Sequence, residues 1–198
     1  MKMKSLFLAL ALIAFTGTAH AATIEYIFQG TGTGTYSGTP GTTGFNSDFT
    51  VTLFGDTSAV FAGINRFDNS VTGNITFGGA LTGVLSAPVS VAVITSGTPT
   101  IGFIQTQPSP VFAVAEATSN SAFGTYDLST ALALTAGNPS FANQTFLTTD
   151  GFINFSSISS LSFEAELVQT PLPAAMPMFI AALASLAAFG LMRRKETV

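Results

Sequence analysis

The side chains that could do chemistry in this 198-residue sequence are carboxylates, amides and hydroxyls. Cysteine and tryptophan are absent, and the single histidine, His20, lies in an N-terminal segment that we expect to be removed. Between that segment and the basic C-terminal end there is no lysine. This inventory leaves no His general base, no Cys or Lys nucleophile and no usual zinc ligand set. We therefore expect a protein without cofactor that is not an enzyme; a hydrolase working with carboxylates alone is the remaining catalytic alternative.

Oxygen ligands gather in the segment Asn65-Arg66-Phe67-Asp68-Asn69, which we expect to be a loop. Calcium accepts carboxylate and amide oxygens without His or Cys. Asn65, Asp68 and Asn69 therefore form a candidate calcium site, with Asp56 or Asp150 as a further ligand. EF-hand spacing is absent, and loops rich in Asn and Asp usually cap their own backbone.

Two other patterns invite a chemical interpretation. Glu164 and Glu166 are spaced i, i+2, which puts them on one face of a strand about 6.5–7 Å apart. Paired carboxylates can hydrolyse glycosides, but alternation with Leu and Phe favours a solvated strand face. The run from Gly30 to Thr35 alternates Gly and Thr with no helix signal after it, so it predicts a strand with a flat threonine row rather than a phosphate-binding loop.

Short alternating apolar runs supply the elements that would position these side chains. The clearest are 49–53, 71–77, 89–93 and 161–167, and further candidates are 24–28, 101–104, 111–116 and 151–155. Turns are expected at 98–99, 108–110, 138–139 and 150–151, and a short helix at 128–136. Phenylalanine at alternating positions favours core packing over a sugar-stacking platform, which usually employs Trp and Tyr. These patterns predict an all-β secreted domain over 22–169, an antiparallel β-sandwich or jelly roll.

The first 21 residues have the three parts of an export signal. Lys2 and Lys4 precede the apolar run 5–15, and Ala19 and Ala21 are small residues at the −3 and −1 positions. The run is too short to cross a bilayer core of about 30 Å. We expect cleavage after Ala21 and export of the domain.

The central segment 22–170 carries one arginine, Arg66, against nine acidic residues, a formal charge of −8. Phosphate backbones repel a domain of this charge, so we expect no nucleic-acid partner.

The C-terminal end predicts a membrane span. Residues 174–192 contain no charged side chain, and as a helix they reach about 28 Å. Arg193, Arg194 and Lys195 follow at once and should stay on the cytoplasmic side. The expected topology places the central domain outside and residues 193–198 inside.

The order of these C-terminal parts resembles the PEP-CTERM sorting signal. Pro171-Leu172-Pro173-Ala174, an Ala- and Leu-rich apolar stretch and a basic cluster within residues 170–198 are closest to its VPLPA variant. Leu172 stands where the name-giving family has Glu, and Thr170 where the variant usually has Val. The resemblance implies an exosortase, a membrane transpeptidase, as partner. It also implies transient anchoring in the inner membrane of an exopolysaccharide-producing bacterium. The alternative is a permanent anchor with proline spacers.

These expectations combine into a non-enzymatic cell-surface or exopolysaccharide-matrix protein. The alternative is a surface-displayed module that binds polysaccharide or calcium.

Overall fold

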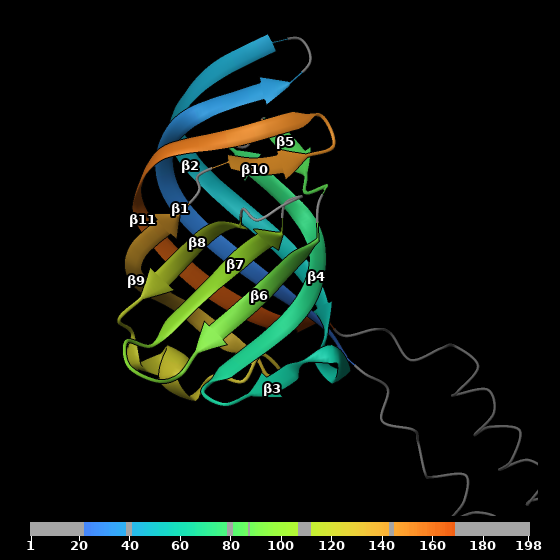
Figure 1. The fold of residues 1–198 in the computed structure, drawn as a ribbon, viewed down its shortest axis with the longest axis vertical. Helices are drawn as coiled ribbons and strands as arrows, with labels where there is room; N and C mark the ends of the chain where they lie inside the picture. Colours follow the sequence, from blue (N-terminus) through green and yellow to red (C-terminus); the bar gives the residue numbers. More distant parts are fainter. Residues whose placement is uncertain are drawn as a thin grey trace, which may run out of the picture. The chain divides into compact units, whose positions relative to one another are not determined.

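The computed structural model describes residues 22–38, 41–78, 81–86, 88–106, 112–142 and 145–168. Their strands pair antiparallel, and eight of them close into a barrel (Figure 1). Neighbours around the barrel are β1 (Thr23–Gly38), β2 (Gly41–Asp56), β4 (Arg66–Phe77), β6 (Val89–Ile94), β7 (Thr100–Thr106), β8 (Phe112–Thr118), β9 (Leu132–Ala142) and β11 (Gly151–Val168). The shorter elements are β3 (Phe61–Gly63), β5 (Leu81–Val84), β10 (Thr145–Thr148) and the 3-10 turns η1 (Thr57–Ala59) and η2 (Ser121–Thr125).

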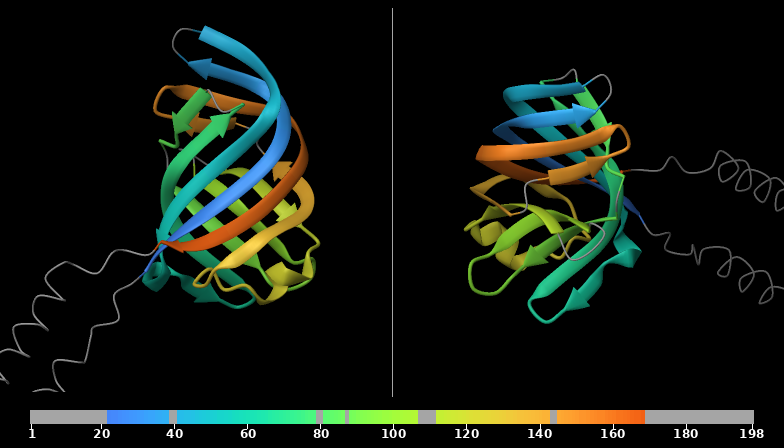
Figure 2. Two further views of the ribbon diagram at one scale, coloured as in Figure 1. Left: turned by 180° about the vertical axis from the view of Figure 1, so that it is seen from behind. Right: turned by 45° about the horizontal axis from the view of Figure 1, so that its top comes forward.

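The expected all-β antiparallel class is confirmed, but the expected sandwich or jelly roll is wrong. Strand β1 pairs with β2 on one side and with β11 on the other, from Thr23 opposite Val168 to Gly38 opposite Gly151. Because the first and last strands pair along their whole length, the sheet closes on itself, and β1 has a partner strand on both sides. Figure 2 shows β1, β2 and β11 curving together around one side of the barrel.

Strand β11 unites two segments that the sequence suggested were separate, 151–155 and 161–167. The serine-rich stretch between them stays in the sheet through two register shifts against β1, near Thr31 and Thr33. Each shift places an extra β11 residue opposite the partner strand, which is a β-bulge and strengthens the local bend. These bulges let an 18-residue strand curve around the barrel.

The expected helix at 128–136 and the expected turn at Asn138-Pro139 are wrong, because both segments contribute to β9. Pro139 pairs with Ala117 of β8, whereas β11 pairs with β9 only from Leu132 to Gly137. The proline therefore lies where β9 has a partner on one side only, which is the kind of strand position at which proline is tolerated.

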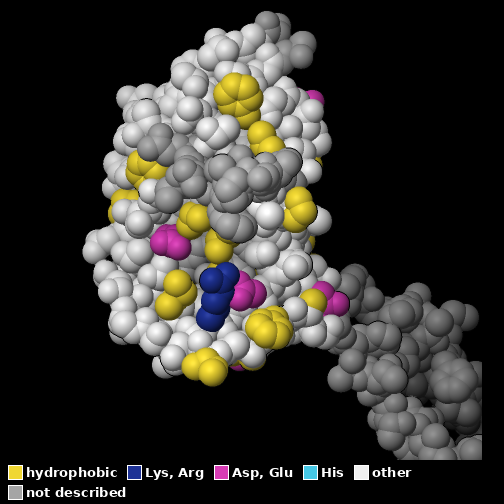
Figure 3. Space-filling view, in the orientation of Figure 1, with side chains coloured by type: hydrophobic (Ala, Val, Ile, Leu, Met, Phe, Trp, Pro, Cys, Tyr) yellow, Lys and Arg dark blue, Asp and Glu magenta, His cyan; other side chains and the backbone are white. Residues whose placement is uncertain are grey.

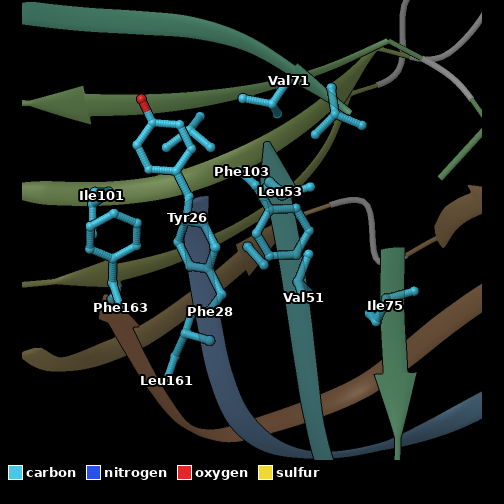
Figure 4. Close-up of a cluster of buried hydrophobic side chains, with 14 of the residues drawn as sticks. Tyr26, Phe28, Val51, Leu53, Val71, Ile75, Ile101, Phe103, Leu161 and Phe163 are labelled. Atoms are coloured by element: carbon cyan, nitrogen blue, oxygen red, sulfur yellow. The ribbon is translucent and has the colours of Figure 1, made fainter. Parts of the chain in front are cut away.

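The prediction that phenylalanine packs the core is confirmed. In one half of the barrel the rings of Tyr26 and Phe28 pack against Phe163, with centroids 6.1 and 4.9 Å away (Figure 4). In the other half, Phe155 contacts the rings of Phe45, Phe49 and Phe77.

Phe146 of β10 joins the two halves, with its centroid 5.0 Å from Phe103 and 6.0 Å from Phe155. The described interior is thus a continuous aromatic core.

Gly30 and Gly34 explain why glycine alternates with threonine in β1. Both face the barrel interior, beneath phenylalanine rings of β2. A methyl group would come within 2.8 Å of the Phe49 ring at Gly30 and 2.7 Å of the Phe45 ring at Gly34. The threonines between them point outward, so the predicted threonine row is present on the outer surface.

Strands β4 and β11 each pair with different neighbouring strands along their length. The first half of β4 pairs with β6, and the second half pairs with β5. The first residues of β11 likewise pair with β10 and its last residues with β9. A bridge from Leu85 to Thr148 connects the two short strands. The end of the barrel remote from Thr23 is thus completed by β5 and β10.

Both ends of the described domain meet at one end of the barrel, where Thr23 lies opposite Val168. The expected signal peptide with Ala19 and Ala21, the motif Pro171–Ala174, the helix 174–192 and the basic cluster Arg193, Arg194 and Lys195 lie outside the described residues. Among the residues that the structure does describe, no helix has the length and apolar character needed to span a membrane.

Candidate functional site

The three candidate calcium ligands lie in different environments. Asn65 is exposed in the turn between β3 and β4, with a positive φ of 58°. Asp68 accepts two hydrogen bonds from the Arg66 guanidinium, from Nε and from Nη2, each at 2.7 Å. Asn69 is fully buried. Successive side chains of a strand point to opposite faces, so Asp68 faces outward and Asn69 faces the interior.

This arrangement gives Asn65, Asp68 and Asn69 no common point at which their oxygens could meet. Asp56, the further ligand considered, caps η1 by accepting hydrogen bonds from the backbone N–H and hydroxyl of Ser58. Across the described ranges, no group of three His, Cys, Asp or Glu side chains is placed to hold a metal ion. The calcium site stays a prediction that this geometry does not support.

Asn69 instead belongs to a buried polar network with Tyr26. Its Nδ2 donates to the Tyr26 hydroxyl at 2.8 Å and to the Asp56 carbonyl at 3.1 Å. The Tyr26 hydroxyl donates onward to the Leu128 carbonyl at 2.6 Å. The network thus ties β1, β4 and the end of β2 to the segment that follows η2.

That segment closes one end of the barrel. Phe123 and Leu128 are fully buried, and the Tyr126 hydroxyl donates to the Thr130 carbonyl at 2.9 Å. Leu128 has a φ of 63°, a conformation that side-chain-bearing residues seldom adopt and that surrounding structure must hold in place. The hydrogen bond from Tyr26 to the Leu128 carbonyl is one of the contacts that hold it.

Burial raises the pKa of both phenols of this end of the barrel. It raises the pKa of Tyr26 to about 12, with the Asn69 hydrogen bond working in the opposite direction. Burial also raises the pKa of Tyr126, and the nearby Tyr26 and Asp127 add to that effect. Both phenols therefore act as hydrogen-bond donors at neutral pH, which is a structural role.

A second polar feature covers the outer wall of β6 and β7. The side chains of Arg66 and Asp68 from β4 and Glu116 from β8 flank Ala92 and Gly102, which are register neighbours between those strands. The Asp68 hydrogen bond raises the pKa of Arg66. Burial raises the pKa of Glu116 while Arg66 lowers it. Figure 3 shows the one basic side chain of the described residues beside an acidic one, on a surface that is mostly neutral.

A third feature is the hydroxyl face, the outward side of β11, β1, β2 and β4. It is defined by Thr31, Thr33, Asp48, Thr50, Thr76, Ser157, Ser160 and Ser162, which alternate with inward-facing core residues. Thr33 Oγ1 lies 2.7 Å from Ser157 Oγ, and Thr31 Oγ1 donates to Asp48 at 2.7 Å. Cross-strand hydrogen bonds therefore fix several of these hydroxyls in one geometry.

Glu164 and Glu166 lie at one end of this outer surface. They alternate with the buried Phe163 and Ala165, so the solvated-face interpretation of the pair is confirmed. Glu166 lies directly opposite Glu25 of β1. Like charges at such a position destabilise a strand pair.

Sequence reasoning missed the polar residues that face inward. Asn69 continues the odd-numbered inward series Val71, Ile75 and Phe77 of β4, so extending that alternation two residues backward would have placed it in the core. Gln105 continues Ile101 and Phe103 in the same way. Its amide donates to the Leu147 carbonyl at 2.8 Å and accepts from the Leu147 N–H at 2.6 Å.

Comparison with protein-family models, with curated proteins and with solved structures gave no match for this chain.

Proposed function

We propose that this protein is an exported, exosortase-sorted component of the cell surface or exopolysaccharide matrix, with a structural or interaction role and no enzymatic activity. The observation that carries the proposal is the order of parts in residues 170–198. A proline motif at Pro171–Pro173 precedes an uncharged stretch of membrane-spanning length, and Arg193-Arg194-Lys195 follows it. Each part alone is common, and the ordered set is much more specific.

The position of Val168 supports this proposal. It is the last residue of β11 and the partner of Thr23, and Pro171 follows only three residues later. A cut at the proline motif would leave every strand of the barrel intact. The domain would keep its fold whether it remains anchored or is released.

The polar side chains that face the barrel interior also fit a non-catalytic role. The buried polar side chains of Tyr26, Asn69 and Gln105 are engaged in hydrogen bonds that join strands and loops. Burial raises the pKa of Tyr26 and of the neighbouring Tyr126 further above the neutral range. Such groups stabilise the fold and offer no nucleophile at neutral pH.

The intact mass of the protein extracted from the cell surface tests the proposal. We expect a mass that begins after Ala21 and ends near Pro171–Pro173 in cells with an exosortase, and an uncut C-terminus in cells without one. Replacing Pro171 and Pro173 by alanine should block the C-terminal cut, whereas replacing Pro177, which lies outside the motif, should not. A soluble intracellular chain of full mass would refute both export and sorting.

A second candidate function is polysaccharide binding by the hydroxyl face. The observation that favours it is the array of hydroxyls on β11 and β1 that hydrogen bonds fix to one another and to the Asp48 carboxylate of β2. Polysaccharides present many hydroxyl donors and acceptors, which an array of this kind can meet. The acidic character of the domain favours a neutral or cationic glycan over an anionic one.

A glycan array with the mature domain tests this second candidate. Replacing Thr33 and Thr50 by valine should weaken binding if the hydroxyl face is the site. The matched control replaces Thr118 on the outer side of β8, far around the barrel, and should leave binding unchanged. Equal binding by both variants would assign the glycan to another surface, and no binding by the parent domain would end this candidate.

A further inference from the structure

An apolar rim lines one side of the barrel end at which β1 begins and β11 ends. It is formed by five exposed hydrophobic side chains, Phe54, Phe61, Ile64, Leu167 and Val168. Ile64 is 93% exposed and Phe61 is 68% exposed. The other exposed large hydrophobic side chains of the described residues are Val84, Leu134 and Phe152, which lie on β5, β9 and the start of β11.

Register shows that the rim residues lie at the same end. Val168 pairs with Thr23, and Thr23 pairs with Asp56 at the end of β2. The backbones of Ala22 and Thr57 are hydrogen-bonded at 3.0 Å, which fixes η1 beside the start of β1. Strand β3, with Phe61, follows η1 directly, and Ile64 is in the turn after β3. The rim thus continues from the last residue of β11 around to the β3–β4 turn.

The length of the connecting chain limits how far this end can be from a bilayer. If residues 174–192 span the membrane, six Cα steps separate Val168 from Ala174, which is at most about 22 Å of extended chain. The headgroup region alone accounts for about 6 Å on each side of the hydrocarbon core. The rim is therefore held close to the lipid surface by its own tether, and contact with lipid becomes an intramolecular event.

We propose that the anchored protein stands on the bilayer with this apolar rim in the headgroup region, the tip of the β3–β4 hairpin being its principal contact. The inference rests on the proposed membrane anchor and adds an orientation to it. The hydroxyl face lies on parts of β1 and β2 away from the rim. In this orientation it would face away from the membrane, toward the matrix.

The charges of the residues near the rim determine whether it would favour zwitterionic or anionic lipid. Arg66 is the only basic residue of the described part of the chain, and it is paired with Asp68. Glu25, Asp56 and Glu166 lie near the rim and carry negative charge. Contact therefore depends on apolar side chains entering a zwitterionic interface and gains nothing from anionic lipid.

The absence of cysteine makes a direct test possible. The full chain, expressed in a host without exosortase, carries Ile64→Cys or the control Phe152→Cys, each labelled with an environment-sensitive fluorophore. Phe152 is also exposed and pairs with Ser37, which is 14 residues along β1 from Thr23 or about 46 Å of strand. Both variants are reconstituted in phosphatidylcholine vesicles, and flotation establishes anchoring before any fluorescence is measured.

We expect nitroxide-labelled lipid to quench the label at position 64 several-fold more than the label at 152, and iodide to quench it less. Adding phosphatidylglycerol should not increase the difference. Equal quenching in vesicles that float would overturn the orientation and leave the anchor standing. Failure to float would overturn the anchor and the orientation together. A third outcome is that neither quencher reaches the label at position 64 and that cross-linking yields dimers. This result would assign the rim to contact with a second copy of the chain and would also overturn the proposal.

Discussion

The amide of Asn69 and the hydroxyl of Tyr26 are hydrogen-bonded at 2.8 Å inside the barrel, although 43 residues separate them in the chain. The Asn69 Oδ1 atom of this pair is buried without a protein partner among the described residues, which is a position where an ordered water is expected. Tyr26 passes the connection on to the Leu128 carbonyl. The pair thus links the barrel wall to the segment that closes one end.

Removing either member of this pair should destabilise the barrel. Tyr26→Phe leaves the Asn69 amide and the Leu128 carbonyl each short of one buried partner, at a cost of about 1–3 kcal/mol in the free energy of unfolding. Asn69→Leu should cost a similar amount. In a double-mutant cycle followed by urea unfolding, we expect a coupling energy of about 1–2 kcal/mol. Strictly additive effects would show that the two side chains act independently.

The raised pKa of Tyr26 predicts a loss of stability at alkaline pH. The folded state prefers the neutral phenol, so the stabilisation is complete below the ordinary value of 10.0 and is lost as the pH rises toward about 12. Tyrosinate absorbance of the folded domain should show delayed ionisation of Tyr26, and Tyr26→Phe should reduce the alkaline decline in unfolding free energy. An unchanged alkaline decline in Tyr26→Phe would argue against this origin.

Gly30→Ala should destabilise the domain because the new methyl group meets the Phe49 ring and the backbone of β11. Overpacking of this kind costs about 1–3 kcal/mol. Gly41→Ala is the matched control, since nothing lies within 4 Å of the position a methyl group would take there. That substitution should leave stability unchanged or raise it by up to about 1 kcal/mol. Thermal unfolding of the two variants side by side measures the difference, and equal melting temperatures would contradict the packing argument.

Gln105 should be required for the attachment of β10. Gln105→Ala removes both hydrogen bonds to the Leu147 backbone, and we expect a loss of about 2 kcal/mol or more. Hydrogen exchange should accelerate most in β10 and its neighbours. Gln29→Ala, on the exposed side of β1, should change stability by less than about 0.5 kcal/mol. If the two variants unfold alike, the bonds to Leu147 contribute nothing measurable.

Local alternation predicted most of the strand positions and the phenylalanine core. The run Leu161, Phe163, Ala165 appears in the structure as three buried positions of β11. The serines between Phe155 and Leu161 interrupt the alternation, so the sequence indicated two separate strands. The bulges that keep these serines within one strand depend on pairing with β1. The pairing of Thr23 with Val168 is non-local, and no periodicity within either strand carries information about it.

The candidate site was predicted less well for a similar reason. Asn65, Asp68 and Asn69 are close in sequence, and a loop would have allowed them to converge. Residues from Arg66 onward are instead in β4, where alternation directs Asp68 and Asn69 to opposite faces. On the outer side, the Asp68 carboxylate forms an ion pair with Arg66.

The antiparallel contact between the first and the last strand has a consequence for when the fold can form during synthesis. Strand β1 leaves the ribosome early, yet one of its two neighbours is the final strand of the domain. The ring cannot be completed until that neighbour has been synthesised, so the nascent chain lacks its finished architecture throughout most of translation. If the protein is exported as proposed, a translocation channel that admits only unfolded polypeptide would receive a chain that has not yet closed its barrel, and closure would follow on the far side.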